Sequence, residues 1–256
     1  MQMRSIYLFV GENKDARGEC RSFLTEKANL FGVKVTDDPK DADAIVVLGG
    51  DGTILRATPI ALEYDVPVIG LNLGRIGYMA ELDVSEDTLI SELFKGNYTE
   101  EKRMTLSVMA GEKTFTALND AVLHSHSTHM IRLCLSCDGS PVNSYRGDGL
   151  IFATPTGSTA YSMSAGGPVI DPTIECIEMT PICTQALMSK TLIFSPGSVL
   201  SVSFDTDDCI LTIDGGESIE LTPNTEVKIS RGARALRMIK LKNDGFYGVL
   251  RRKFSE

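Results

Sequence analysis

The sequence predicts two domains of different fold class: an α/β amino-terminal domain with a mainly parallel sheet, and a β-rich, sandwich-like carboxyl-terminal domain. In residues 1–98, apolar strand-like runs alternate with helix-like segments. In residues 99–240, short alternating segments are separated by turn signals instead. The remaining stretch, 241–256, carries apolar residues among basic ones and is expected to pack back on the first domain.

The amino-terminal domain begins with an apolar run at Ser5–Val10, which we interpret as a strand and not as a signal peptide because charged residues follow at once. Ala44–Leu48 is uninterrupted and apolar, as expected for a parallel strand buried on both faces. Gly32 stands where a glycine would end the preceding helix. The predicted strands are Ser5–Val10, 33–35, Ala44–Leu48 and 66–71, and the predicted helices are 15–31, 54–63 and 85–95.

The carboxyl-terminal domain shows strand-like alternation, for example at 105–109 and 131–135. Glycine-containing turns such as Asp138-Gly139 and Asp214-Gly215 separate these segments. Short strands at this spacing favour an antiparallel sandwich. We expect the active site in a cleft between the two domains.

The composition excludes several functional classes. A formal net charge of -9 disfavours binding to nucleic acid, which depends on cations that neutralise phosphates. No apolar stretch approaches the ~20 residues that span a bilayer, so we expect no membrane association. The six cysteines are scattered, as in a cytoplasmic protein with reduced thiols.

The run Gly49-Gly50-Asp51-Gly52-Thr53 carries the strongest chemical signal. It follows a predicted buried strand and precedes a helix, and ligands of α/β sheets bind at the carboxyl ends of strands. Glycines there let backbone N–H groups approach phosphates, and the start of a helix favours negative charge. An idle Asp-Gly turn would suit a hairpin better than this strand-to-helix connection.

The absence of two other phosphate motifs narrows the chemistry. The sequence contains no Gly-x-x-x-x-Gly-Lys-Ser/Thr loop and no Gly-x-Gly-x-x-Gly after the first strand. An aspartate among phosphate-binding glycines instead indicates phosphoryl transfer, with Asp51 accepting a proton or helping to hold a metal ion. No metal-binding cluster is visible, so a divalent ion, Mg²⁺, is expected to be held mainly by donor phosphates and water.

Three further runs accompany this motif. Gly70-Leu71-Asn72-Leu73-Gly74-Arg75-Ile76-Gly77-Tyr78-Met79 follows the next strand, where a plain loop is an equal alternative to a site. The run 154–168 is rich in Thr, Ser and Gly around Tyr161 and is long for an idle turn, so we interpret it as a binding loop for a base. Asn119-Asp120 could hold ribose hydroxyls but has no specificity alone.

Together with Leu73-Gly74-Arg75-Ile76-Gly77-Tyr78 and Arg146-Gly147-Asp148-Gly149, these runs resemble the motifs of bacterial NAD kinases in order and spacing. The resemblance covers nearly the whole chain, including the tail Phe246-Tyr247-Gly248-Val249-Leu250-Arg251. It implies phosphorylation of the 2′-hydroxyl of the adenosine ribose of NAD, giving NADP. It also implies ATP or polyphosphate as the donor and a homodimer or homotetramer.

The resemblance implies that site residues come from each motif. Asp51 would act on the 2′-hydroxyl, with Gly52 beside it and Arg56 reaching phosphate. The other implied site residues are Tyr78 of the second run, Asn119 and Asp120 for ribose or phosphate-side groups, Thr159, Ala160, Tyr161 and Ser164 around the adenine and dinucleotide, and Arg146 and Asp148 for the nicotinamide half, within the chain or across a subunit boundary.

The sequence departs from the family pattern at two places. The family usually has Asn-Glu where this chain has Asn119-Asp120, and aspartate reaches one methylene less far. Asp214-Gly215 is followed by Gly216 and not by a polar amide, so no ligand contact is assigned there. Two rivals remain: a lipid kinase, which would need an apolar cleft, and a non-catalytic nucleotide sensor, against which the intact Asp51 argues.

Two other features carry less weight. His124, His126 and His129 lie close together, but a partly exposed strand end explains them better than a metal site because no carboxylate or cysteine is near in sequence. Cys134 and Cys137 would point to opposite faces of an extended strand, which argues against a metal or redox pair.

Overall fold

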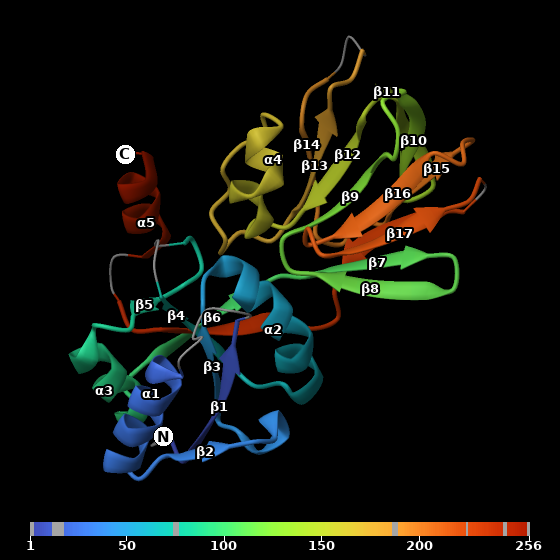
Figure 1. Ribbon diagram of the computed structural model, residues 1–256. Helices are drawn as coiled ribbons and strands as arrows, with labels where there is room; N and C mark the ends of the chain where they lie inside the picture. Colours follow the sequence, from blue (N-terminus) through green and yellow to red (C-terminus); the bar gives the residue numbers. More distant parts are fainter. Residues whose placement is uncertain are drawn as a thin grey trace. The chain divides into compact units, whose positions relative to one another are not determined.

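The computed structural model describes residues 3–11, 18–73, 77–185, 189–223, 225–242 and 245–254 (Figure 1). The chain forms two compact units, one of residues Met1–Lys102 with Leu236–Glu256 and one of Arg103–Ala235. The boundaries differ from the predicted 99–240, because strands at both ends of that range belong to the sheet of the first unit. No helix in the described part of the chain has the length and apolar character needed to cross a bilayer.

The first unit contains a sheet with strand order β2-β1-β3-β4-β19-β6 and with β5 beside β4. The pairs of β1 with β2 and β3, of β3 with β4, and of β4 with β5 and β19 are parallel. All five residues of β3 and of β4 are buried, as the apolar runs predict. The strands are β1 (Ser5–Val10), β2 (Lys34–Thr36), β3 (Ala44–Leu48), β4 (Val68–Asn72), β5 (Leu82–Asp83), β6 (Thr99–Arg103) and β19 (Leu236–Lys240).

Helices connect these strands. Gly32 follows the first helix at φ +71°, as predicted for a glycine at a helix end, and Gly96 ends α3 in the same conformation at φ +81°. The second helix begins three residues earlier than predicted, which makes Asp51 its first residue. The helices of this unit are α1 (Glu19–Leu30), η1 (Pro39–Asp41), α2 (Asp51–Tyr64), α3 (Asp87–Lys95) and α5 (Gly245–Phe254).

The second unit is a sandwich of two six-stranded sheets, with strand orders β11-β10-β15-β18-β7-β8 and β14-β13-β12-β9-β16-β17. One hydrophobic core takes residues from both sheets, including Val108, Leu133, Leu150 and Leu211. The predicted fold class is therefore confirmed for both parts of the chain. The strands are β7 (Leu106–Ala110), β8 (Lys113–Ala117), β9 (Asp120–Ser125), β10 (Ile131–Cys137), β11 (Ser140–Gly147), β12 (Gly149–Ala153), β13 (Ile177–Ile182), β14 (Leu192–Phe194), β15 (Leu200–Phe204), β16 (Cys209–Ile213), β17 (Glu217–Leu221) and β18 (Val227–Arg231).

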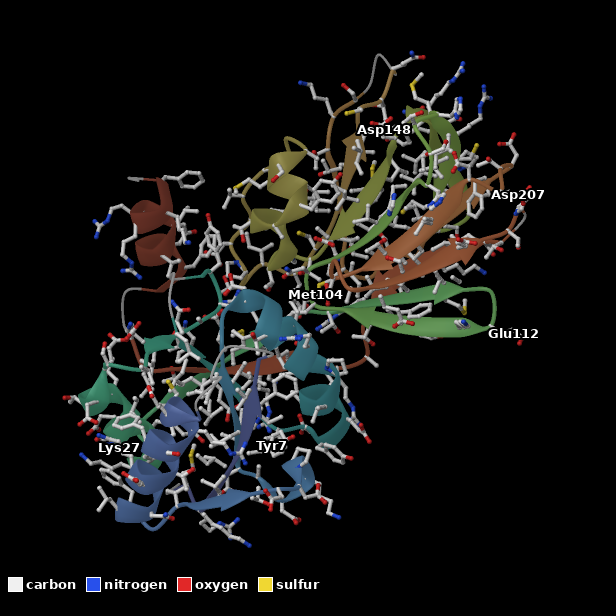
Figure 2. All side chains as sticks on the ribbon, in the orientation of Figure 1. Tyr7, Lys27, Met104, Glu112, Asp148 and Asp207 are labelled. Atoms are coloured by element: carbon white, nitrogen blue, oxygen red, sulfur yellow. The ribbon has the colours of Figure 1, made fainter. Side chains whose placement is uncertain are left out.

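The connections of the sandwich follow turn chemistry. Asp138-Gly139 joins β10 to β11 and Asp214-Gly215 joins β16 to β17, and all four residues have positive φ. Figure 2 shows Glu112 in the turn between β7 and β8 and Asp207 between β15 and β16, both at the ends of strands. Between β12 and β13 the chain forms η2 (Gly157–Thr159) and the one-turn helix α4 (Tyr161–Ser164), within the predicted binding loop.

Candidate active site

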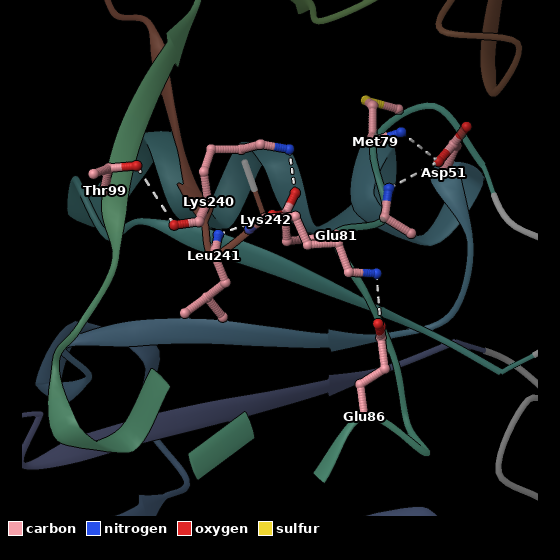
Figure 3. A network of polar contacts seen from close by, with 9 residues as sticks. Asp51, Met79, Glu81, Glu86, Thr99, Lys240, Leu241 and Lys242 are labelled. Atoms are coloured by element: carbon pink, nitrogen blue, oxygen red, sulfur yellow. Dashed lines mark hydrogen bonds and ion pairs between the residues drawn. The ribbon is translucent and has the colours of Figure 1, made fainter. Parts of the chain in front are cut away.

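Asp51 stands at the carboxyl end of β3, where the chain turns through Gly49 and Gly50 into α2. Its carboxylate accepts hydrogen bonds from the backbone N–H groups of Tyr78 at 2.7 Å, Met79 at 3.0 Å and Ala80 at 3.3 Å. Figure 3 shows the contact between Met79 and Asp51. A carboxylate held by consecutive N–H groups has a fixed orientation and stays an acceptor. The second glycine run therefore positions Asp51 and is more than a plain connection.

Gly77 makes this approach possible. A Cβ at position 77 would collide with both carboxylate oxygens of Asp51. Because only glycine leaves that space, the loop can bring its N–H groups onto the carboxylate. Gly74, Arg75 and Ile76 of the same run lie outside the described residues.

The other implied site residues of this unit, Gly52, Arg56 and Tyr78, differ in their exposure. Gly52 is exposed, and a Cβ there would meet no atom within 4 Å. Tyr78 is half-buried, and burial raises the pKa of its phenol, with the charge of Asp51 adding to the effect. Arg56 is exposed on α2, five residues beyond Asp51, so the two side chains leave the helix in different directions.

The segment after the loop holds the carboxyl-terminal tail within the same unit. Glu81 is 6% exposed and accepts the N–H groups of Leu241 and Lys242, each at 2.8 Å, and it pairs with the ammonium of Lys240 (Figure 3). Farther along the tail, the ammonium of Lys253 lies 5.6 Å from the centre of the Tyr78 ring. The tail thus reaches a residue that hydrogen-bonds Asp51.

A second group of candidate residues lines a cavity of about 350 Å³ in the sandwich unit. It joins two motifs that are far apart in sequence: Asn119 and Asp120 at the start of β9, and Ala160 and Tyr161 beside α4. The Oδ1 atom of Asn119 is buried there, and no described residue donates a hydrogen bond to it. The full lining is Asn119, Asp120, Val122, His124, Ala160, Tyr161, Thr212, Asp214 and Gly215.

Asp214 is a functional candidate that the sequence interpretation left unassigned. Its carboxylate accepts the backbone N–H groups of Leu118 at 2.9 Å, Asn119 at 2.7 Å and Asp120 at 3.0 Å. Its own N–H donates to the carbonyl oxygen of Asp120 at 2.9 Å. Asp214 therefore positions the Asn119-Asp120 pair, a role that its place in an Asp-Gly turn does not reveal.

Asp120 and Asp214 share a buried environment. Burial, followed by the nearby charge of Asp214, raises the pKa of Asp120 to about 7. Burial also raises the pKa of Asp214, but its three backbone N–H donors oppose that rise. The three donors favour the charged form of Asp214, so Asp120 is the member of the pair that takes a proton more readily.

Comparison with known proteins identifies the family. Residues 11–98 match the ATP-NAD kinase N-terminal domain, and residues 118–241 match the ATP-NAD kinase C-terminal domain. An NAD kinase of Caldicellulosiruptor bescii is 37% identical over 97% of this chain and 98% of its own length. An NAD kinase of Natranaerobius thermophilus is 34% identical over 99% and 98%.

This chain belongs to the ATP-NAD kinase family. Solved structures agree. An NAD kinase from Archaeoglobus fulgidus in complex with ATP matches with a TM-score of 0.83 and 26% identity, over 99% of this chain and 100% of that one. Yeast NADH kinase complexed with NADH shares the fold, with a TM-score of 0.83 and 24% identity over 98% and 87%. The resemblance of the motifs to NAD kinases is thereby confirmed.

The remaining site residues implied by the NAD kinase resemblance also belong to the sandwich unit. Thr159 is half-buried in η2 and donates to the carbonyl oxygen of Thr156 at 3.3 Å, and Ser164 is exposed at the end of α4. Neither Arg146 nor Asp148 is among the residues that line the cavity, and both are exposed (Figure 2 labels Asp148).

The register places Asp148 at the opposite end of β9 from Asp120. In the pair of β9 with β12, Asp120 lies opposite Ala153 and His124 lies opposite Gly149. Asp148, the residue before β12, therefore lies beside the last residue of β9, and its carbonyl oxygen accepts the N–H of Ser125. Its carboxylate also raises the pKa of the Cys183 thiol by hydrogen bonding.

The histidines separate in the structure. His124 lines the cavity, with Nδ1 2.9 Å from the carbonyl oxygen of Ser125 and Nε2 3.1 Å from the hydroxyl of Thr212. Strand β9 ends at Ser125, so His126 leaves the strand and does not share a strand face with His124. Among the described residues, no group of three or more His, Cys, Asp or Glu is placed to hold a metal ion.

The cysteine pair lies in one strand. Cys134 is exposed, whereas Cys137 packs against the core of the sandwich. The two thiols thus point to opposite faces of β10, as the spacing predicts.

Proposed function

We propose that Asp51 receives the proton of the ribose 2′-hydroxyl of NAD as that oxygen attacks the terminal phosphorus of the donor. A 2′-O–P bond forms, the bond from that phosphorus to the bridging oxygen breaks, and the shortened donor leaves with the electron pair. Membership of the family makes the reaction itself the phosphorylation of NAD to NADP, a phosphotransferase reaction with an alcohol acceptor.

The hydrogen bonding of Asp51 carries this proposal. Three N–H donors occupy three of roughly four acceptor positions of the carboxylate. One position is left for a hydroxyl proton, and the carboxylate cannot rotate away from it. Phosphoryl transfer depends more on positioning and charge than on base strength, so a fixed carboxylate suits the reaction. Gly52 and the start of α2 add backbone N–H groups suited to donor phosphates.

We assign the adenosine part of NAD to the cavity of the sandwich unit. The buried Oδ1 atom of Asn119 is an acceptor for a hydroxyl or amino group, and Asp120 supplies a second acceptor once ionised. The ring of Tyr161 is 46% exposed and offers a face on which a base can stack. Thr159, Ala160 and Ser164 frame the dinucleotide in this proposal.

The donor is ATP, with polyphosphate as an alternative, and the cofactor is Mg²⁺. In this proposal the ion arrives on the donor phosphates with part of its own water shell. When bound, the ion supplies positive charge to the donor phosphates. Arg56 is exposed near the start of α2 and is proposed to reach phosphate. We further propose a cytoplasmic homodimer or homotetramer, in which Arg146 and Asp148 serve the nicotinamide half.

A turnover assay tests the proposal. Purified protein is incubated with NAD and Mg²⁺ and with either ATP or polyphosphate, and the product is identified as NADP by an NADP-dependent dehydrogenase. We expect NADP with ATP and no product after Mg²⁺ is removed with a chelator. Formation of a 3′-phosphate, or turnover unaffected by the chelator, would contradict the corresponding part of the proposal.

A further inference from the structure

A buried acid under α4 has no role in the reaction described above. Glu178 is fully buried in β13 (0% exposed), and the described structure gives it no cation. Its Oε1 atom accepts hydrogen bonds from the hydroxyls of Ser162 at 2.8 Å and Thr180 at 3.2 Å, while its Oε2 atom has no hydrogen-bond partner among the described residues. Burying a lone carboxylate is costly, so the neutral acid is favoured.

The hydroxyl contact ties Glu178 to the cavity. Ser162 lies in α4, directly after Ala160 and Tyr161, which line the cavity. A helix of one turn has little stability of its own, so its position depends on side-chain contacts. Gly167 packs closely against this contact, because a Cβ at that position would collide with both Glu178 and Ser162.

We propose that Glu178 is a positioning residue for the dinucleotide: it accepts the hydroxyl of Ser162, anchors α4 and so keeps Ala160 and Tyr161 in place for NAD. The inference rests on the proposed function, because it takes this cavity to be the NAD site. It assigns Glu178 an effect on substrate affinity and none on the chemical step.

The surroundings of Glu178 set its pH dependence. Its partners across the sheet are Ala153 of β12 and Ile193 of β14, and α4 faces it with Ser162, so none of these elements presents a charge. The titratable neighbour in the described structure is Cys176, whose thiol pKa is raised by burial and then by Glu178. Burial raises the pKa of Glu178. The contribution of this raised pKa to the stability of the fold is therefore complete at low pH and is lost as pH rises through that pKa, whereas the carboxyl group can accept the hydroxyl of Ser162 in either protonation state.

Two substitutions separate a neutral hydrogen-bonding side chain from an apolar one. Glu178→Gln keeps an acceptor for Ser162 without a charge, and Glu178→Leu keeps similar volume without an acceptor. We expect Glu178→Leu to raise the KM for NAD about tenfold with kcat within about twofold, since a lost buried hydrogen bond is worth roughly that factor. Glu178→Gln should keep the KM for NAD within about twofold of wild type, because its amide oxygen accepts the same hydroxyl.

The comparison is made at each pH from 6 to 9, so the titration of Asp120 cancels between variants. If Glu178→Leu does not fold, Ser162→Ala removes the same contact, with Thr191→Val as the control because Thr191 contacts Thr180 and not Glu178. An unchanged KM in Glu178→Leu or Ser162→Ala overturns the inference, as does a KM in Glu178→Gln as high as in Glu178→Leu. Calorimetric Kd values for NAD report on Glu178 even if wild type forms no NADP, so a failure of the proposed function stays distinguishable.

Discussion

Two aspartates in different units of the molecule are held in the same way. Asp51 accepts hydrogen bonds from the consecutive N–H groups of residues 78, 79 and 80, and Asp214 from those of residues 118, 119 and 120. In both, three consecutive backbone N–H groups orient the carboxylate.

The difference between the two lies in their neighbours. Asp51 begins helix α2 beyond the carboxyl end of strand β3. It is half-exposed and has a glycine on each side in the sequence. Asp214 is set in a hairpin turn beside Asp120, a second buried carboxyl group whose pKa it raises. The same arrangement of three backbone donors therefore has different neighbours in the two units: in the first it orients the proposed base, and in the second it positions Asn119 and Asp120 and places a charge that raises the pKa of Asp120.

Replacing Asp51 should give the largest effect. In Asp51→Asn the amide would present its own N–H groups to one of the backbone donors, so at least one of the three bonds is lost. We expect kcat to fall about 10²- to 10⁴-fold through loss of the base, with the Kd for NAD little changed. The measurement is NADP formation beside calorimetric NAD binding, with Glu63→Gln, exposed at the other end of α2, as the control. A near-normal kcat would show that Asp51 only shapes the turn.

Gly77→Ala tests positioning without removing the base. The new Cβ would displace the Asp51 carboxylate, and misplacing a reacting group by about 1 Å can cost roughly 10²-fold in rate. We expect kcat to fall about 10- to 100-fold while the protein stays folded. Gly197→Ala is the matched control, because a Cβ there would meet only Ser195, at 3.9 Å. Equal activity of the two variants would mean that the orientation of Asp51 is not critical.

Asp214→Asn should impair binding more than chemistry. The amide again opposes one backbone donor, and a buried unsatisfied group costs about 1–3 kcal/mol. We expect the KM for NAD to rise about tenfold and the free energy of unfolding to fall by about 1–3 kcal/mol. The fall in kcat should be smaller than in Asp51→Asn. If kcat fell as far as it does in Asp51→Asn with the KM unchanged, Asp214 would itself belong to the chemical step.

The contrast also shows what the sequence can predict. Asp51 was found because its glycines and its place between strand and helix are local features. Asp214 was not, because its hydrogen bonds reach residues 94 to 96 positions away and depend on how β9 and β16 align. Likewise, the sequence interpretation places Leu236–Lys240 in the carboxyl-terminal domain, whereas this strand pairs with β4 of the first unit, a long-range choice that no local pattern encodes. Local chemistry was predictable, and partners across the fold were not.

The pKa of Asp120 gives a pH-dependent test of the second unit. An aspartate with an ordinary pKa near 3.9 when unfolded and about 7 when folded stabilises the fold fully below about pH 4. That contribution is lost as pH rises through about 7. We expect Asp120→Asn to remove this trend, on the order of 2 kcal/mol between pH 5 and 8 in denaturant titrations. Parallel curves for the variant and wild type would refute the raised pKa.

Asp138→Asn should give the smallest effect and separates the turn from the cavity. Asp138-Gly139 repeats the dipeptide and the left-handed backbone of Asp214-Gly215, with φ of 50° and 78° against 49° and 64°. The carboxylate of Asp138, however, accepts only one backbone N–H in the described structure, that of Val199 at 2.9 Å, and it lines none of the cavities described above.

Asparagine tolerates this backbone, and its carbonyl oxygen can accept the same bond. We therefore expect the free energy of unfolding of Asp138→Asn to stay within about 0.5 kcal/mol of wild type, with unchanged kcat and KM. If Asp138→Asn were as damaging as Asp214→Asn, the cost would belong to the Asp-Gly turn itself. If Asp214→Asn were clearly more damaging than Asp138→Asn, the cost would come from the three backbone hydrogen bonds of Asp214 and from its buried partner Asp120.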